Sequence, residues 1–302
     1  MHLTVLSRSA GIFTTRRIVE AARKRGHRTR VLDPLQVEME LGEAPQLYHR
    51  GRPFPRTDVV IPRIASTAMG HGVAVVNQLQ VMGVPVLNGA AALSVARNKM
   101  RVLQLLSAGG VKVPHTVMAA EATGLKDMVR LVGGLPVLVK LIRGNGRTGV
   151  IVCETRAALE SALEAILRLG QNIVVQQYLR GVKGGDLRVL VVGGRVAATL
   201  RRRPRVGKLS RTLGQGARFE PGRLDAAAEG AALEAARVVG LEICAVDLLD
   251  ARGGPRVFEV NASPGIKEAE EICKVDVAAL VVARAEELAA AAGRGPGHRR
   301  RG

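Results

Sequence analysis

Aromatic residues are nearly absent from this chain of 302 residues, which has no Trp, two Tyr and four Phe. Proteins that bind single-stranded nucleic acid stack the bases on aromatic side chains, so a single strand is excluded as the main ligand. Cysteine is scarce too: Cys153, Cys244 and Cys273 lie far apart and form no CxxC pair. This spacing argues against a disulfide framework and a zinc knuckle.

Long hydrophobic runs are also missing, since no stretch approaches the ~18 uninterrupted apolar residues of a membrane span. The first residues, MHLTVL, lack the charged start and the long apolar run of a signal peptide. We therefore expect a cytoplasmic protein without membrane association. Apolar residues still make up 47% of the chain, which is enough to build a core and is not typical of a disordered chain.

Acidic residues are outnumbered, with 26 Asp and Glu against 45 Lys and Arg, and the net charge is +19. A field of this sign attracts nucleoside triphosphates, acidic peptides or nucleic acid. The alternative is that the arginines simply cover solvated faces. Residues 293–302 (GRGPGHRRRG) have the composition of a disordered basic tail.

The N-terminal part alternates apolar runs with helical patterns. We predict strands at 3–6, 29–32, 59–61 and 84–87, and helices at 15–25, 72–82 and 90–108. Strands that alternate with helices indicate a small parallel α/β unit.

From residue 137 onward the strands are more frequent and adjoin one another. We predict strands at 137–141, 150–153, 173–177, 187–192, 196–200, 243–249 and 256–260, and helices at 155–169, 226–239 and 275–291. Thr155 is a suitable N-cap, and Gly193 with Gly194 predicts a hairpin. The chain is therefore α/β overall and α+β in this second part.

A glycine-rich segment, GNGRTG at 144–149, separates two of these strands. A dinucleotide fingerprint of this form must open a helix, and here a strand follows. A glycine-rich turn between antiparallel strands can instead lay its backbone N–H groups over nucleotide phosphates. Lys140 ends the preceding strand, where its ammonium group can reach the same phosphates. The alternative for the loop alone is an ordinary flexible hairpin.

Three oxygen-bearing side chains lie on or directly after the last two predicted strands. Glu259 and Asn261 are two residues apart on one strand and so share a face. A turn centred near Gly253 would place Asp247 directly opposite Glu259. Carboxylate and amide oxygens are ligands suited to Mg²⁺, and a cation would relieve the repulsion between the two acids. The alternative is a pair of solvated acids on an outward face.

Basic residues lie between the glycine-rich loop and this pair of strands. Asp186 and Arg188 share a strand face, and the carboxylate could accept ribose hydroxyls. The cluster at 201–211 is rich in arginine, whose planar guanidinium binds phosphate and carboxylate groups through two hydrogen bonds. A solvated basic loop is the alternative for this cluster.

Seven segments occur in a fixed order: IPRI (61–64), the helix with Lys99, VLVKL (137–141) with its loop, VVQQYL (174–179), GGDLRVLVVGG (184–194), AVDLL (245–249) and FEVNASPG (258–265). Together they resemble the RimK-type α-L-glutamate ligases of the ATP-grasp superfamily. The resemblance spans about residues 1–290, and AVDLL with FEVNASPG is its most specific part. It implies an ATP-grasp fold preceded by a small Rossmann-like N-terminal domain.

The implied domains follow the segments along the chain. They are an N-terminal α/β domain at 1–90, a small ATP-grasp subdomain with the glycine-rich flap at 91–176, a large subdomain with the magnesium platform at 177–292, and the disordered basic tail at 293–302.

The resemblance also implies roles for individual residues. The magnesium ligands would be Asp247, Glu259 and Asn261. The nucleotide would be bound by Lys99, Lys140, Gly144, Gly146, Gly149, Asp186 and Arg188, with the backbone of Gln177, Tyr178 and Leu179 as the adenine hinge. Arg202 and Arg211 would act on the γ-phosphate and the acyl-phosphate.

The implied reaction uses ATP and a pair of Mg²⁺ ions, for which Mn²⁺ can substitute. A carboxylate is phosphorylated, and an amine then attacks the acyl-phosphate. The family adds L-glutamate to the C-terminus of a small-subunit ribosomal protein and tends to form tetramers, so an acidic protein or peptide acceptor and a homo-oligomer are implied. Relatives act on amino-group carrier proteins or on small molecules, which is the first alternative. A non-catalytic basic protein that binds RNA or the ribosome is the alternative from another class.

This chain departs from the family's pattern at several positions. The usual QEY is QQY at 176–178, the usual FRxN is LSRT at 209–212, and Arg147 stands near a usual glycine. The last two departures fall in segments that would contact the acyl-phosphate and cover the nucleotide, so they bear on substrate choice.

Overall fold

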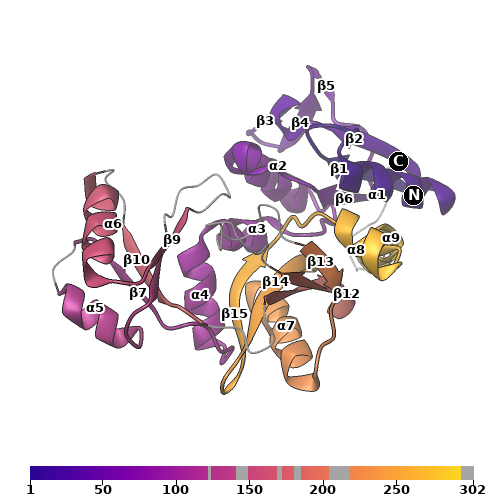
Figure 1. Ribbon diagram of the computed structural model, residues 1–302. Helices are drawn as coiled ribbons and strands as arrows, with labels where there is room; N and C mark the ends of the chain where they lie inside the picture. The colour runs from indigo at the N-terminus through magenta and orange to yellow at the C-terminus, as the bar shows by residue number, and fades with distance from the viewer. Residues whose placement is uncertain (122–123, 141–148, 169–171, 180–184, 204–217, 294–302) are drawn as a thin grey trace.

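The described residues form four separate sheets and the helices that cover them, which are drawn in Figure 1. The computed structural model describes residues 1–121, 124–140, 149–168, 172–179, 185–203 and 218–293. Among these residues no helix is both long and apolar enough to span a membrane.

The N-terminal sheet is parallel, as the alternation of strands and helices predicted. Its order is β2 (Arg28–Leu32), β1 (His2–Leu6) and β6 (Val59–Pro62), with α1 (Phe13–Lys24) and α2 (Met69–Val81) in the connections. The run predicted at 84–87 is extended and contributes one parallel bridge, Val60 to Val86.

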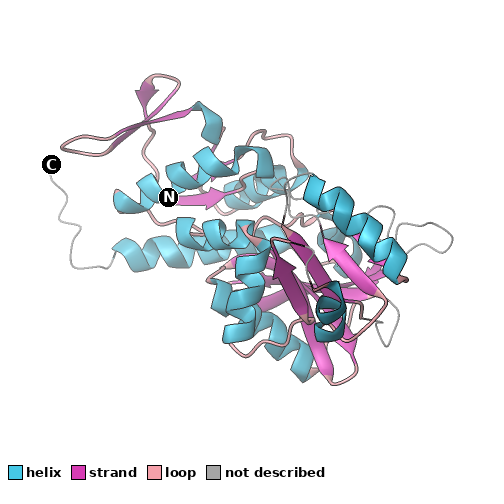
Figure 2. Ribbon diagram, turned by 90° about the vertical axis from the view of Figure 1, so that its left-hand side faces the viewer, coloured by secondary structure: helices cyan, strands magenta, loops and turns pink. Residues whose placement is uncertain are grey.

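A second, antiparallel sheet was not predicted. It consists of β3 (Val37–Glu40), β4 (Gln46–His49) and β5 (Arg52–Pro53), and a 3-10 turn, η1 (Pro34–Gln36), precedes it. Figures 1 and 2 place it at the top of the molecule, and its Val37 and Leu47 share a core with Leu6 and Leu32 of the N-terminal sheet. Its strands are short and largely polar, so they carry little of the apolar pattern on which a prediction depends.

The helix predicted at 90–108 is two helices, and the prediction of one continuous helix is wrong. The first, α3 (Ala90–Arg97), ends at Asn98, and α4 (Lys99–Ala108) begins directly after it. Asn98 has extended backbone angles, φ −95° and ψ 100°, and its side chain accepts a hydrogen bond from the Arg101 N–H. Asparagine is among the preferred N-cap residues, so this break begins α4 with Lys99 in its first turn.

The third sheet has its own core. Its order is β7 (Thr116–Ala119), β10 (Ile173–Gln177), β8 (Val137–Lys140) and β9 (Val150–Cys153), and α5 (Leu125–Leu131) and α6 (Arg156–Arg168) pack against it. Thr155 caps α6 as predicted, by accepting a hydrogen bond from the Ala158 N–H. The strands β8 and β9 pair antiparallel, so the predicted arrangement of strands around the glycine-rich segment is confirmed. Residues 144–148 of that segment lie outside the described residues.

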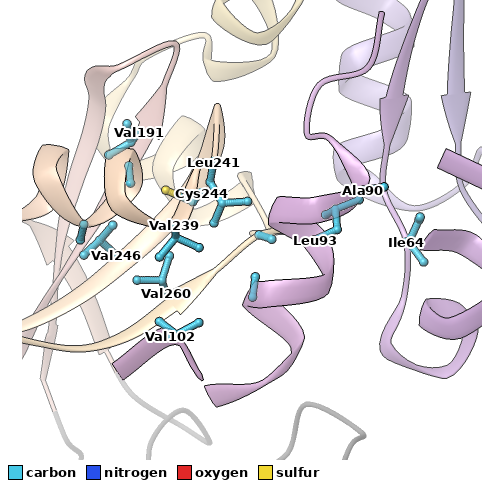
Figure 3. Close-up of a cluster of buried hydrophobic side chains, with 14 of the residues drawn as sticks. Ile64, Ala90, Leu93, Val102, Val191, Val239, Leu241, Cys244, Val246 and Val260 are labelled. Carbon is cyan, nitrogen blue, oxygen red and sulfur yellow. The ribbon is translucent and has the colours of Figure 1, made fainter. Parts of the chain in front are cut away.

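The fourth sheet is antiparallel and has five strands. Its order is β13 (Arg218–Pro221), β12 (Arg195–Arg203), β11 (Asp186–Val192), β14 (Ile243–Ala251) and β15 (Gly254–Asn261). The helix α7 (Ala226–Val239), with the bounds that the sequence predicted, packs on one face. Figure 3 shows the apolar side chains between this face and the helices α3 and α4, including Val246, Val260 and Leu93.

The opposite face of this sheet packs against the end of the chain. The helix α8 (Lys267–Cys273), which the sequence analysis missed, contacts β12 and β13, and α9 (Val277–Gly293) contacts β11 and β12. The same α9 packs against α1 and β6, so the C-terminal helix joins this sheet to the N-terminal unit. The domain bounds given by the family resemblance stay a prediction.

Candidate active site

One face of the five-stranded sheet changes from apolar to charged along its strands. On β11, Leu190 and Val192 are buried in the core below α9, and Arg188 and Asp186 continue the same alternation toward the other end. On β14, Ile243 and Ala245 are likewise followed by Asp247. Because side chains alternate between faces along a strand, these charged residues share one face beside the packed core.

Asp247 lies directly opposite Glu259, as the sequence analysis predicted. The reason is a β-bulge. Ala251 pairs with Gly254 and Leu248 with Val257, so an unbroken ladder would place Asp247 opposite Phe258. The register shifts between Asp247 and Leu248, which leaves an extra residue on β15 and turns the carboxylate of Glu259 toward that of Asp247.

Asp247 is held by two arginines. Arg188, from β11, donates from Nε to Oδ1 at 2.8 Å and from Nη2 to Oδ2 at 2.7 Å. Arg202, from β12, approaches Oδ2 at 3.4 Å. Asp247 is only 1% exposed, and a buried carboxylate requires such partners. The hydrogen bond to Asp247 raises the pKa of Arg188 above its ordinary value.

Asp186 pairs with Arg202 and not with Arg188. Arg202 donates from Nε to Oδ1 at 3.0 Å and from Nη2 to Oδ2 at 2.5 Å, and both side chains are buried. Burial raises the pKa of Asp186, although Arg202 acts in the opposite direction. The sequence predicted that Asp186 and Arg188 share a strand face. It did not predict their partners, because β11 pairs with β12, which carries Arg202, on one side and with β14, which carries Asp247, on the other.

Two lysines reach Glu259 from other parts of the fold. Lys99, at the start of α4, places Nζ 2.7 Å from Glu259 Oε1 and 3.4 Å from the Val260 carbonyl oxygen. Burial by itself raises the pKa of Glu259, but the charges of Lys99, Lys140 and Arg188 outweigh burial and the pKa is lowered. Glu259 is therefore ionised at neutral pH.

Lys140 ends β8 in the third sheet and faces this charged cluster. Burial lowers its pKa to about 8; Lys99 adds to the effect and Glu259 opposes it. The charges of Glu259 and Lys99 act on Lys140, so β8, α4 and β15 each contribute a charged side chain to one site.

The donor set at this site fits Mg²⁺. Asp247 and Glu259 offer carboxylate oxygens, and Asn261 follows on β15, where its Oδ1 now accepts a hydrogen bond from the Ser263 N–H at 2.9 Å. Mg²⁺ prefers such oxygen ligands and completes its shell with phosphate oxygens and water. Within the described residues there is no group of three or more His, Cys, Asp or Glu side chains placed to hold a metal ion, so water and phosphate would have to supply part of the shell.

The other predicted residues are distributed as follows. Gln177 ends β10, and its N–H donates to the His115 carbonyl oxygen at 2.8 Å. Tyr178 and Leu179 follow it and are half-buried. Gly149 directly precedes β9. Gly144, Gly146, Arg147 and Arg211, with the whole of 209–212, lie outside the described residues.

Arg63 was not among the predicted site residues. It directly follows the buried strand β6, and its Nη2 donates to the Pro264 carbonyl oxygen at 2.5 Å, just beyond Asn261. A charged residue at the end of the apolar run VVIP is the signal in the sequence that could have indicated it.

Comparisons with known proteins agree with this arrangement. Residues 96–284 match the family model described as a RimK-like ATP-grasp domain, and residues 1–93 match a RimK PreATP-grasp domain. A protein of Thioalkalivibrio sulfidiphilus named "Probable alpha-L-glutamate ligase" is 42% identical over 290 residues, which cover 96% of each chain.

Solved structures share the fold at low sequence identity. A RimK domain protein ATP-grasp from Sphaerobacter thermophilus superposes with a TM-score of 0.72 at 21% identity, over 94% of this chain and 99% of that one. The ATP-grasp ligase PsnB, complexed with minimal precursor, Mg and ADP, has a TM-score of 0.70 at 23% identity, over 94% and 98%.

Proposed function

We propose that this chain, which belongs to the RimK-like ATP-grasp family and is an ATP-dependent ligase, is a glutamate ligase. With ATP and Mg²⁺ it adds L-glutamate to the C-terminal carboxylate of an acidic protein or peptide. The observation that carries the proposal is the pair Asp247 and Glu259, which face each other across β14 and β15. Lys99, Lys140, Arg188 and Arg202 surround this pair with positive charge.

Two negative charges in one buried place need a counter-charge. Asp247, Glu259 and Asn261 would hold Mg²⁺, which when bound supplies positive charge at the oxygens of the transferred phosphoryl group. Lys99 and Lys140 would contact the phosphates, because Lys99 Nζ lies 2.7 Å from Glu259 Oε1 and the charge of Lys140 also acts on that carboxylate. Arg202, anchored by Asp186, would be held in a fixed orientation toward the same place.

The chemistry needs positioning and charge neutralisation and no nucleophilic side chain. A carboxylate oxygen of the acceptor attacks the γ-phosphorus of ATP, and the bond to the β–γ bridging oxygen breaks to release ADP. The amine of glutamate attacks the acyl carbon, loses a proton, and inorganic phosphate leaves as the amide forms. Cationic side chains stabilise the charge that develops in both steps.

Two observations support glutamate and an acidic acceptor. The relative that is 42% identical over nearly the whole chain carries the name of an alpha-L-glutamate ligase. The net charge of +19 would draw an acidic peptide toward the site.

The test measures ADP formation with ATP and Mg²⁺, with glutamate alone, with an acidic peptide acceptor and with both together. We expect the full rate only with both substrates, and mass spectrometry should show glutamate-sized additions to the peptide. Turnover only with an amino-group carrier protein or a small molecule would reject the acceptor proposed here.

A matched pair of variants tests the site itself. Glu259→Gln should lower ADP formation by about 100-fold or more, since it removes one charge at the reacting phosphate. Glu220→Gln removes the same charge from β13, where Glu220 pairs with Arg203 at the surface, and should leave the rate unchanged. An unchanged rate in Glu259→Gln would reject the assignment of this face as the active site.

A further inference from the structure

Arg63 stands where the N-terminal sheet meets the loop that follows β15. It directly follows β6, and its N–H donates to the Leu6 carbonyl oxygen at 2.8 Å, which fixes its backbone to the neighbouring strand β1. In open α/β sheets, ligands bind beyond the carboxyl ends of the parallel strands. Arg63 occupies that edge of this sheet.

The side chain of Arg63 is closely surrounded by protein and yet has no anionic partner among the described residues. It is partly accessible to solvent, and burial lowers its pKa to about 10. Its Nη2 donates to the Pro264 carbonyl oxygen, and in the part of the chain that the structure describes no carboxylate forms an ion pair with it. A guanidinium group has five N–H donors, and a desolvated cation without a counter-charge is costly.

Ser263 supplies a second unsatisfied group in the same place. Its Oγ is buried and has no hydrogen-bond partner among the described residues. Buried polar groups are nearly always hydrogen-bonded, so such an atom needs an explanation. Ser263 is adjacent to Pro264, whose carbonyl oxygen accepts the hydrogen bond from Arg63, so a free hydroxyl and a cation without a counter-charge come together at this loop.

The loop lies close to the proposed metal ligands. Ser263 follows Asn261 by two residues, which span at most ~7 Å of chain, and its N–H is hydrogen-bonded to Asn261 Oδ1. A carboxylate bound here would therefore lie close to the proposed metal ligand Asn261.

We infer that Arg63 and Ser263 form a binding site for a carboxylate of the incoming amino acid, one that does not react. This inference rests on the proposed function and names the residues that recognise the glutamate. The planar guanidinium group presents parallel N–H donors that match the two oxygens of a carboxylate, and the Ser263 hydroxyl can donate a further hydrogen bond. The bound carboxylate supplies the negative charge that Arg63 lacks.

The test compares wild type with Arg63→Gln, using ATP, an acidic peptide and three amines: L-glutamate, L-glutamine and 4-aminobutyrate. Glutamine lacks the side-chain carboxylate and 4-aminobutyrate lacks the α-carboxylate. Arg63→Gln should raise the KM for glutamate by about 10- to 100-fold, the range for a lost hydrogen bond to a charged group, and leave the KM for ATP within about twofold. One of the two analogues lacks the carboxylate that Arg63 binds, and wild type and Arg63→Gln should have equal KM values for that analogue. This analogue therefore identifies which carboxylate Arg63 recognises.

Two further variants complete the design. Arg56→Gln removes the same charge at the opposite end of β6, where Arg56 is 77% exposed, and should behave as wild type. Ser263→Ala, a smaller change that keeps the loop, should raise the KM for glutamate about 3- to 10-fold without changing the KM for ATP.

Calorimetric titration of glutamate, in the presence of a non-hydrolysable ATP analogue, separates this inference from the proposed ligase activity. Wild type should bind glutamate, and Arg63→Gln should bind it at least 10-fold more weakly. If wild type forms no ADP with glutamate and an acceptor, the proposed function fails, and the titration still decides the role of Arg63. An absence of glutamate binding to wild type would overturn the inference. The inference would also be overturned if the variants at Arg63 and Ser263 bound glutamate as tightly as wild type does. The same holds if Arg63→Gln lowered the affinity for ATP as much as the affinity for glutamate.

Discussion

Asp247 accepts hydrogen bonds from Arg188 at both carboxylate oxygens and from Arg202 at Oδ2, and Glu259 is held by Lys99. The ligand-free site thus satisfies its acids with its own cations. Mg²⁺ and a polyphosphate would bring charges of both signs, so the acids could turn to the metal while the cations turn to the phosphates. The site exchanges one set of ion pairs for another, which lowers the electrostatic cost of nucleotide binding.

Lys140 gives this site a pH dependence. Burial lowers its pKa to about 8 in the free protein, and bound phosphates would hold its proton to higher pH. Below pH 8 the lysine is already charged, so ATP affinity should be constant there and fall by up to tenfold per pH unit above it. Titration with a non-hydrolysable ATP analogue between pH 6.5 and 9.5 measures this dependence.

The control for this prediction is Lys140→Arg. Arginine stays charged across that range, so the decline above pH 8 should vanish in the variant. A wild-type affinity that does not change with pH would contradict the role of Lys140 at the phosphates.

The pair Asp186 and Arg202 should contribute strongly to stability, because both groups are buried. Asp186→Asn removes the negative charge that faces Arg202, so that Asp247, at 3.4 Å, is the one carboxylate in the described residues still in contact with the guanidinium group. We expect the free energy of unfolding to fall by about 3 kcal/mol, as measured by urea denaturation. Arg203→Gln, which breaks a pair with Glu220 whose side chains are 49% and 36% exposed, should cost less than about 1 kcal/mol. Equal losses in the two variants would show that burial does not set the strength of the pair.

At the scale of the elements, the bulge in the hairpin of β14 and β15 decides which side chains meet. Val257 and Val260 are three residues apart, yet both lie in the core below α7, which an unbroken strand would not allow. The bulge at Phe258 reverses the alternation between them and so brings Glu259 to the face of Asp247. The extra residue in β15 therefore allows both valines to lie in the core and also places Glu259 opposite Asp247.

The break between α3 and α4 positions Lys99 in a similar way. Asn98→Ala removes the side chain that caps α4 and should lower the free energy of unfolding by about 1 kcal/mol. It should also raise the KM for ATP, because Lys99 begins the frayed turn. Asn98→Asp keeps the capping oxygen and should retain both properties. If α4 were instead a continuation of α3, the alanine variant would be as stable as wild type or more stable.

At the scale of the whole molecule, the charge of +19 should govern encounters with acidic partners. Salt screens such fields, with a Debye length of ~10 Å at 0.1 M and ~3 Å at 1 M. Between 0.05 and 0.5 M salt we expect the KM for an acidic peptide acceptor to rise about tenfold. The KM for a neutral peptide that ends in a single glutamate should rise much less. Equal salt dependence for the two peptides would reject electrostatic attraction of the acceptor.

The homo-oligomer that the family resemblance implies is a prediction at this scale as well. Light scattering on the purified full chain would give its mass directly. A mass of four chains would agree with the resemblance, and a single-chain mass would contradict it.

The sequence by itself determined the local elements and the identity of the charged groups. The apolar alternation of β11 and β14, the turn at Gly193 and Gly194, and the bounds of α7 all follow from short-range pattern. The facing of Asp247 and Glu259 was predicted from a turn centred near Gly253, but the actual turn pairs Ala251 with Gly254, and only the β-bulge brings Glu259 opposite Asp247.

Only the tertiary structure decided the pairings between distant segments. That Arg188 binds Asp247 depends on β14 pairing with β11, which no local pattern records, whereas Asp186 and Arg202 meet within the predicted hairpin of β11 and β12. The approach of Lys140 to Glu259 requires two sheets to meet, and that of Arg63 to Ser263 and Pro264 requires the N-terminal sheet to close on the loop after β15. Strand order and packing between sheets arise from the burial of non-polar surface over the whole chain, so they set which charges neutralise one another.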